Sequence, residues 1–250
     1  MHSFSLAAAI AAGTVFVASS ISLAAPVTVA YWAFPSDTPA TGDNFKFNPP
    51  IAADLKANVG LAVLTTDVVQ WNGSPTGTGL AQGALQYFGG SILGLISPSV
   101  PGSGLSIRGL TTPNTDLSNS NNKSITLQFD STGFGALQLS YAERVTGTGP
   151  DNLNFSVSAD GVTFSPVSSL GTTKDGTFRT RIVDLSSFSA INNDPTAYVK
   201  IQFTGGFTNS TGTIRFDNIT LTAVPEPTTL GLVAVSAFGL LRRRRRYSST

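Results

Sequence analysis

From Ser103 onward, the chain consists of short runs in which apolar and polar residues alternate, separated by turn-forming residues. In KSITLQFD, for example, Ile125, Leu127 and Phe129 fall on one face, as expected for a strand with one buried side. The same alternation recurs in ALQLSYAER, NLNFSVSADGVTF, TFRTRIVDL, AYVKIQF and TIRFDNITLT. The pattern predicts an all-β body that folds as a β-sandwich.

Two interruptions of the alternation predict particular connections. Asp160-Gly161 lies between two strand-like runs and is a common signal for a short β-hairpin turn. DLSSFSAINNDP breaks the alternation, and Asp184 or Ser186 could cap a single helical turn that ends before Pro195. We interpret this second segment as a short crossover between the two sheets.

The first third of the chain gives a weaker pattern. VTVAYWAF predicts an opening strand, but GSPTGTGLAQGALQYFGGSILGLISPSVPGSG is rich in glycine and proline and has no clear period. We expect long loops here, lying over one end of the sandwich. Three aromatic residues in this region either cover that end of the sandwich or are ordinary core residues: Trp71, Tyr87 and Phe88.

Charge and composition exclude several partners and chemistries. Five of the fifteen basic residues form one C-terminal cluster, and the body from Ala25 to Ala223 carries ten basic and thirteen acidic residues. Such a mildly acidic body has no electrostatic footprint for nucleic acid. The chain contains no cysteine, which removes disulfides, thiol catalysis and cysteine-based zinc sites.

The first 24 residues resemble a secretory signal peptide. Leu6 to Ala18 form an apolar segment, and SLAAP offers small residues for cleavage between Ala24 and Ala25. The segment lacks the usual basic residue before its apolar part. An uncleaved membrane anchor is the alternative interpretation.

The C-terminus has three parts: a Pro-Glu-Pro motif, an apolar run and an arginine cluster. The apolar run, Thr228 to Leu241, is shorter than the roughly 20 residues that usually cross a bilayer. Because positive charge stays cytoplasmic, the arginines would hold the preceding body outside. The prolines on either side of Glu226 should bar helix and strand, and leave an extended segment that a protease could grip.

This order of parts closely resembles the PEP-CTERM sorting signal of Gram-negative bacteria. The motif comprises Val224, Pro225, Glu226 and Pro227, and the positive anchor comprises Arg242, Arg243, Arg244, Arg245 and Arg246. The resemblance implies recognition by the membrane enzyme exosortase, with an inner-membrane-anchored intermediate and then release or transfer to the cell surface. A plain C-terminal membrane anchor is the alternative. We therefore divide the chain into a signal peptide (1–24) that forms a helix, a body (25–223) and a sorting signal (224–250) whose apolar run forms a short transmembrane helix.

Part of the body carries a second resemblance. The strand-like runs between Asn121 and Leu221 are similar to the jelly-roll domain found in exported bacterial proteins with this type of tail. Such domains are similar in architecture to galactose-binding-type and carbohydrate-binding modules. The resemblance implies a fold rather than an activity, because one fold serves many functions.

Little in the body points to catalysis. The only histidine is His2, which lies within the predicted signal peptide, so a Ser-His-Asp triad and a histidine-ligated metal centre are excluded. Glu143 is the only glutamate between Ala25 and Ala223, and we expect it to form an exposed ion pair with Arg144. The sequence predicts a protein that is not an enzyme.

One metal site is predicted. In TIRFDNITLT the apolar phase shifts at Asp217-Asn218, which implies a β-bulge. Related jelly-roll modules often hold a structural calcium through a last-strand aspartate, and this resemblance makes Asp217 a candidate ligand, with Asp37 as a second. The alternative is that Asp217 caps neighbouring backbone amides.

These features lead to three hypotheses for function. The first is a non-enzymatic surface or extracellular-matrix protein, and the sorting resemblance implies an association with exopolysaccharide and biofilm. The second is a dedicated carbohydrate-binding module in which Tyr141, Tyr198 or Trp71 stacks on sugar rings, with Tyr198 on the outer face of its strand. The third is a polysaccharide hydrolase, and the absence of histidine from the body argues against it.

Overall fold

The fold was analysed in a computed structural model of the full chain. The structure describes residues 24–34, 50–68, 85–96, 103–109, 120–207 and 212–226. The predicted signal peptide before Ala24 and the apolar and arginine-rich segments after Glu226 lie outside these ranges.

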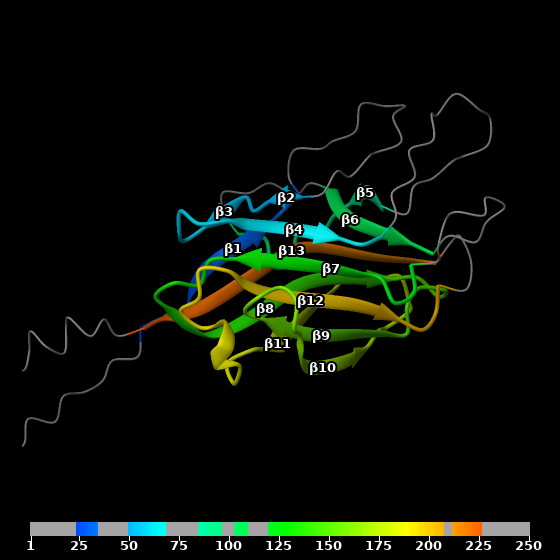
Figure 1. The fold of residues 1–250 in the computed structure, drawn as a ribbon. Helices are drawn as coiled ribbons and strands as arrows, with labels where there is room; N and C mark the ends of the chain where they lie inside the picture. Colours follow the sequence, from blue (N-terminus) through cyan, green and yellow to red (C-terminus); the bar gives the residue numbers. More distant parts are fainter. Residues whose placement is uncertain are drawn as a thin grey trace, which may run out of the picture.

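The described residues form two antiparallel sheets that face each other as a jelly-roll β-sandwich (Figure 1). Sheet 1 has the order β11-β8-β13-β1-β3, with β6 also paired to β13 and β5 paired to β6. Its strands are β1 (Val27–Trp32), β3 (Leu55–Lys56), β5 (Leu85–Gly89), β6 (Ser103–Arg108), β8 (Phe134–Val145), β11 (Arg179–Asp184) and β13 (Thr213–Pro225). Sheet 2 has the order β10-β9-β12-β7-β4-β2. Its strands are β2 (Ile51–Ala52), β4 (Ala62–Thr66), β7 (Ser124–Phe129), β9 (Asn152–Ser158), β10 (Ser165–Gly171) and β12 (Ala197–Thr204).

The core lies between the sheets and is built from alternate residues of each long strand. In β12, for example, every second side chain is buried, as the sequence predicted. Tyr141 of β8 and Phe216 of β13 come from sheet 1, with ring centroids 5.5 Å apart. Phe155 and Phe203 of sheet 2 lie 6.2 Å from Tyr141 and 5.9 Å from Phe216, respectively. This aromatic cluster joins the two sheets.

The longest strand, β13, changes partner along its length. On one side it pairs with β8 almost throughout. On its other side, the first part pairs with β6 up to Phe216, and the later part pairs with β1 from Ile219 onward. The register with β8 shifts between Asp217 and Thr220, and Asn218 has a φ of 49°. The predicted β-bulge is therefore confirmed, and it lies where β13 passes from one neighbour to the next.

Several predicted connections are confirmed, with corrections of detail. β9 and β10 form the predicted hairpin, and Gly161 adopts a φ of 72°, but the loop spans residues 159–164 rather than two residues. The crossover from sheet 1 to sheet 2 contains one 3-10 turn, Ser189–Ile191. Neither predicted residue caps that turn: Phe188 is the capping position, and Asp184 instead accepts from the backbone N–H of Ser186 at 2.8 Å.

The first third holds more strands than the sequence suggested. Residues Leu85–Gly89, which we expected within a loop, form β5 and pair with β6. Tyr87 and Phe88 therefore belong to a strand. The short strands β2, β3 and β4 were also not predicted. Trp71 lies outside the described residues.

The start of β1 and the end of β13 lie at the same end of the sandwich, which we call the tail end (Figure 1). Val27 pairs with Ala223, and the preceding residues Ala24 and Ala25 are exposed. The opposite end, where β13 begins and β8 finishes, we call the far end. The expected signal-cleavage residues and the Pro-Glu-Pro motif are thus close together in space, although almost the whole body separates them in sequence.

Candidate functional sites

The first residues of the Pro-Glu-Pro motif belong to the sheet. Val224 pairs with Gly135 and Pro225 pairs with Phe134, both on β8. The backbone N–H of Glu226 then donates to the carbonyl of Gly133 at 2.8 Å. The expectation that the prolines bar strand formation is therefore wrong for Pro225. It is the last residue of β13, where the absence of an N–H removes no hydrogen bond from the strand interior.

The rest of the motif leaves the body directly. Glu226 is exposed, and its side chain lies over Gly135, where an added Cβ would be 2.9 Å from Oε1. No linker separates β13 from the motif. Pro227, the apolar run Thr228 to Leu241 and the arginine cluster lie outside the described residues. Within the described ranges, no helix is long and apolar enough to cross a membrane.

The bulge in β13 carries a buried polar network. Asn218 donates to the carbonyls of Ser91 and Leu93 at 2.8 and 3.0 Å, and its Oδ1 accepts from the Tyr31 hydroxyl at 2.7 Å. The same hydroxyl accepts from the backbone N–H of Ile96 at 3.2 Å. Both Asn218 and Tyr31 are buried. The network fixes the segment after β5 against β13 and β1. The sequence predicted the bulge but not this role of Asn218 and Tyr31.

Asp217 caps backbone amides at the same bulge. Its Oδ2 accepts from the N–H of Ser91 and its Oδ1 from the N–H of Asn218 at 2.8 Å. Burial raises the pKa of the Asp217 carboxyl to about 6, although the two amide hydrogen bonds act in the opposite direction. This is the arrangement named above as the alternative to calcium binding.

The calcium site itself stays a prediction. Calcium requires six to eight oxygen ligands, whereas the described surroundings of Asp217 present N–H donors to both carboxylate oxygens. Among the described residues, no three His, Cys, Asp or Glu side chains are grouped as metal ligands would be. Asp37 lies outside those ranges. A calcium-dependent rise in melting temperature that is lost in Asp217→Ala would support the site, and an unchanged melt in chelator would exclude it.

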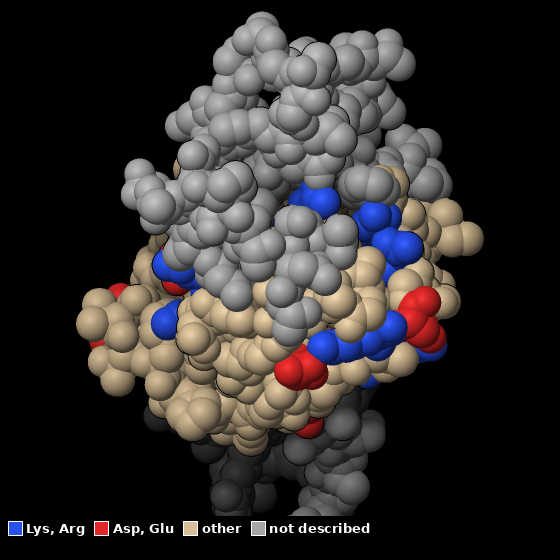
Figure 2. Space-filling model, turned by 90° about the vertical axis from the view of Figure 1, so that its right-hand side faces the viewer, with Lys and Arg blue, Asp and Glu red and all other residues tan. Residues whose placement is uncertain are grey.

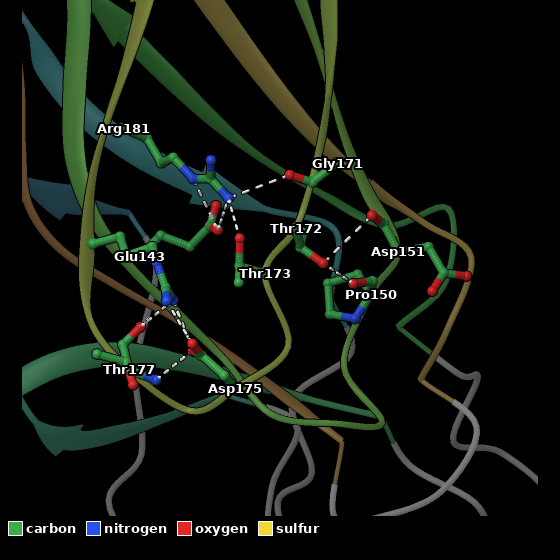
Figure 3. Close-up of polar contacts among 10 residues, drawn as sticks. Glu143, Pro150, Asp151, Gly171, Thr172, Thr173, Asp175, Thr177 and Arg181 are labelled. Atoms are coloured by element: carbon green, nitrogen blue, oxygen red, sulfur yellow. Dashed lines mark hydrogen bonds and ion pairs between the residues drawn. The ribbon is translucent and has the colours of Figure 1, made fainter.

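Glu143 is not the exposed partner of Arg144 that we expected. Its side chain is buried, and its Oε1 accepts from Arg181 Nε and Nη2 at 3.2 and 3.0 Å (Figure 3). Arg144 follows Glu143 in β8 and therefore points to the other face of the strand. Burial raises the pKa of Glu143, and the charge of Arg181 partly opposes the increase.

Arg181 also connects the edges of the two sheets. Its strand, β11, is the edge of sheet 1, and its Nη2 donates to the carbonyl of Gly171 in β10, the edge strand of sheet 2, at 3.2 Å (Figure 3). A further contact reaches Thr173 Oγ1 at 3.4 Å. The arrangement is a structural clasp, since Arg181 pairs with the buried carboxylate of Glu143 and also donates to the edge strand of sheet 2.

The aromatic candidates for sugar stacking have different environments. Tyr141 is wrong as a candidate, because its ring is buried in the core. Tyr198 lies half-buried on the outer face of β12, as predicted, and its ring lies over Gly161, where an added Cβ would be 2.9 Å from Cζ. On the same strand, Lys200 Nζ lies 3.4 Å from the ring centroid of Phe164. Tyr198 is thus the described candidate that a ligand could reach.

Comparison with protein-family models agrees with the resemblance to a sorting signal. Residues 223–246 match the model of the PEP-CTERM protein-sorting motif. A search of curated protein sequences finds no significant match. Among solved structures, a xylan-binding module, CBM15, aligns with 67% of this chain and 99% of its own, at 15% identity and a TM-score of 0.39.

Two other solved structures have similar scores. The K1 cleaved adhesin domain of Lys-gingipain from Porphyromonas gingivalis W83 aligns with 79% of this chain and 97% of its own, at 13% identity and a TM-score of 0.36. The CBM22-1 xylan-binding domain of Xyn10C from Paenibacillus barcinonensis aligns with 57% of this chain and 82% of its own, at 11% identity and a TM-score of 0.36. The chain thus carries a PEP-CTERM protein-sorting motif directly after an all-β sandwich of the jelly-roll type.

Proposed function

We propose that this protein is an exported, non-enzymatic bacterial surface or extracellular-matrix protein that exosortase processes. Residues 1–24 act as its signal peptide, 25–223 as its body and 224–250 as its sorting signal. The observation that carries the proposal is the PEP-CTERM match over residues 223–246. The site residues keep the predicted roles: cleavage between Ala24 and Ala25, recognition at Val224 to Pro227, and retention by Arg242 to Arg246.

The geometry of the tail end supports this order of events. The proposed cleavage at Ala24-Ala25 and the proposed recognition motif would both be at one end of the sandwich, since β1 and β13 pair up to Val27 and Ala223. The chain enters the body and leaves it at the same place. An anchored intermediate would therefore hold the tail end against the membrane and turn the far end outward, before transfer to the cell surface or the extracellular space.

The proposed partner outside the cell is exopolysaccharide. The sorting resemblance implies an association with exopolysaccharide. A body that folds without cysteine or histidine is suited to a structural rather than a catalytic role outside the cell. Glu143, the sole glutamate of the body, is paired with Arg181, which argues against its use as the acid or base of a glycoside hydrolase. Matrix and biofilm association is the function that these features favour.

A replacement of the sorting motif tests the proposal. In the native host, the Glu226→Ala variant should accumulate unprocessed in the membrane fraction, and a variant that lacks Arg242 to Thr250 should lose the membrane-retained intermediate, whereas the wild type reaches the surface fraction. Immunoblots of the two fractions measure this distribution. Asp175→Ala is a suitable control, because that residue is exposed and its neighbour Gly176 is hydrogen bonded to Val145, at the far end of β8. Equal surface delivery of all the variants would contradict exosortase sorting.

A dedicated glycan-binding module is the second candidate, and the partial exposure of Tyr198 on the outer face of β12 favours it. Aromatic rings that lie flat on a sheet surface are suited to stacking on sugar rings. If this candidate is right, binding of the purified chain on a glycan array should be lost in Tyr198→Ala. An array that shows no binding at high protein concentration would favour the matrix role.

A further inference from the structure

An exposed apolar turn lies at the tail end of the body. It joins β3 to β4 over residues 57–61, on the side of the molecule where β1 begins and β13 ends (Figure 1). Val59 and Leu61 of this turn have relative accessible areas of 101% and 52%. Val27, at the start of β1, is a third exposed apolar residue at the same end. We call Val27, Val59 and Leu61 the apolar rim.

Hydrogen bonds connect this turn to the place where the sorting motif leaves the body. Asn58 Nδ2 donates to the carbonyls of Asp130 and Thr132, in the turn between β7 and β8, at 3.3 and 3.0 Å. The next residue of that turn, Gly133, accepts from the backbone N–H of Glu226 at 2.8 Å. The apolar rim is therefore held beside Glu226 through a single intervening turn.

Two further contacts fix the shape of the turn itself. Lys56 Nζ donates to the carbonyls of Val59 and Gly60 at 3.4 and 2.9 Å. Asp130 lies so close to Gly60 that a side chain at this position would overlap its carboxylate. Because the turn is already ordered, little conformational entropy is lost when the exposed side chain of Val59 meets a partner.

The sorting signal brings this end of the body to the bilayer. Thr228, the first residue of the apolar run, comes two residues after Glu226. Two residues of extended chain span at most about 7 Å. The headgroup layer on each side of the hydrocarbon core is itself about 5–7 Å thick. When the run is inserted as proposed, Glu226 and the apolar rim must lie within this layer or against it.

Electrostatic attraction does not account for such a contact. Figure 2 views the far end, where Lys and Arg side chains gather, and this end would point away from the bilayer. At the tail end, Asp130 and Glu226 carry negative charge, and the ammonium group of Lys56 is engaged by carbonyls of its own turn. Burial of apolar side chains is the favourable interaction that the rim offers to lipid. The contact should therefore need no anionic lipid and should resist added salt.

We propose that the apolar rim is a membrane-docking surface, which rests the tail end on the outer face of the inner membrane in the anchored intermediate. The inference rests on the proposed function, because it requires the apolar run to be inserted. Docking would set the height and tilt at which the body presents the Pro-Glu-Pro motif to a membrane-embedded protease. The inserted run keeps the rim at a high local concentration beside the lipid, so weak apolar contacts suffice.

The test measures the depth of the turn in the bilayer. The anchored intermediate is purified from a native-host strain that lacks exosortase and is placed, one copy each, in phosphatidylcholine nanodiscs. Because the chain contains no cysteine, Ala57→Cys carries a single spin label next to the rim. We expect this label to be accessible to oxygen but protected from a water-soluble nickel complex. A label at Thr177→Cys, exposed at the far end, should remain accessible to nickel.

Substitutions in the rim show whether its apolar side chains cause the protection. Val59→Ser combined with Leu61→Ser should expose the Ala57→Cys label to the nickel complex. Ile182→Ser is the matched control, because Ile182 is 58% exposed but lies within β11, and it should leave the protection unchanged. Protection that survives the double substitution, that is lost equally in the control, or that added salt abolishes would overturn the proposal.

A label at Ala234→Cys, within the apolar run, separates this proposal from the proposed function. Protection at Ala234 together with exposure at Ala57 would overturn the docking surface alone. Exposure at both positions would also contradict the membrane-anchored intermediate. Protection of Ala57 that appears only after exosortase is added would assign the rim to the enzyme and overturn docking on lipid.

Discussion

At the scale of single residues, Asn218 has the most demanding position in the body. It adopts a left-handed φ of 49°, a conformation that asparagine tolerates better than most side chains. Its amide satisfies two carbonyls and the Tyr31 hydroxyl at the point where β13 changes neighbours. Thus one side chain supports both the backbone geometry of the bulge and the attachment of the segment after β5.

We predict that Asn218→Ala destabilises the body by about 2–4 kcal/mol, because it leaves buried polar groups without partners and places alanine at a positive φ. Urea denaturation of the purified chain measures the change in the free energy of unfolding. Asn154→Ala is the control, since Asn154 lies in a regular strand and makes one side-chain hydrogen bond, to Thr204 at 3.3 Å. Equal destabilisation by both variants would contradict the role assigned to Asn218.

The carboxyl of Asp217 should make stability depend on pH. Folding raises its pKa from 3.8 to about 6, so folding favours the neutral form. The resulting stabilisation is complete below pH 3.8 and is lost as the pH rises through about 6. A shift of about two pKa units corresponds to about 3 kcal/mol at most. We expect the free energy of unfolding to decrease between these pH values in the wild type.

The same decrease should be much smaller in Asp217→Asn. The raised pKa of Glu143 acts in the same direction and accounts for any remainder. Asp160→Asn serves as the control, because backbone N–H groups lower the pKa of Asp160 to about 2, which places its effect at more acidic pH. A pH profile that Asp217→Asn leaves unchanged would show that this carboxyl titrates normally in the fold.

At the scale of elements, the edges of the two sheets are joined by the clasp of Glu143 and Arg181. We predict that Arg181→Ala destabilises the body by about 3–5 kcal/mol, because Glu143 would remain buried without its cation. Arg179→Ala should cost less than about 1 kcal/mol, since its pair with Asp175 is exposed. Thermal unfolding of the two variants compares these effects directly, and similar losses would refute the distinction.

The end of β13 should limit the access of the protease to the motif. Val224 and Pro225 are paired with β8, and Glu226 is hydrogen bonded to Gly133. Six Gly and Ser residues inserted after Ala223 would move the motif away from the sheet. We predict that this insertion speeds processing in a pulse-chase experiment in the native host. The same insertion in the exposed loop at Gly147 is the control, and equal rates for both would mean that strand pairing does not restrain cleavage.

Some elements could be predicted from the sequence because their signal is local. The alternation in β7, β9 and β12 and the phase shift at Asp217 are properties of neighbouring residues. The partner of Glu143 is not local, because it depends on the register of β11 against β8. Tyr141 shares a face with Leu137 and Leu139, so the alternation itself argued against its exposure.

At the scale of the whole molecule, the two ends of the body lie together at the tail end. The tail end joins the start of β1 to the end of β13, because Val27 pairs with Ala223. The proximity of Ala25 and Val224 could not be predicted without the sheet topology, because almost the whole body separates them in sequence. The sorting signal, in contrast, is a short linear motif and could be identified without the fold.

The most direct test is mass spectrometry of both chain ends in protein extracted from the surface of the native host, with and without its exosortase. The account predicts a chain that begins at Ala25. It predicts an end between Val224 and Pro227 only when the enzyme is present. Without the enzyme, residues up to Thr250 should remain attached. A C-terminus that still contains Arg242 to Thr250 in both strains would contradict the account, and would make the tail a plain membrane anchor.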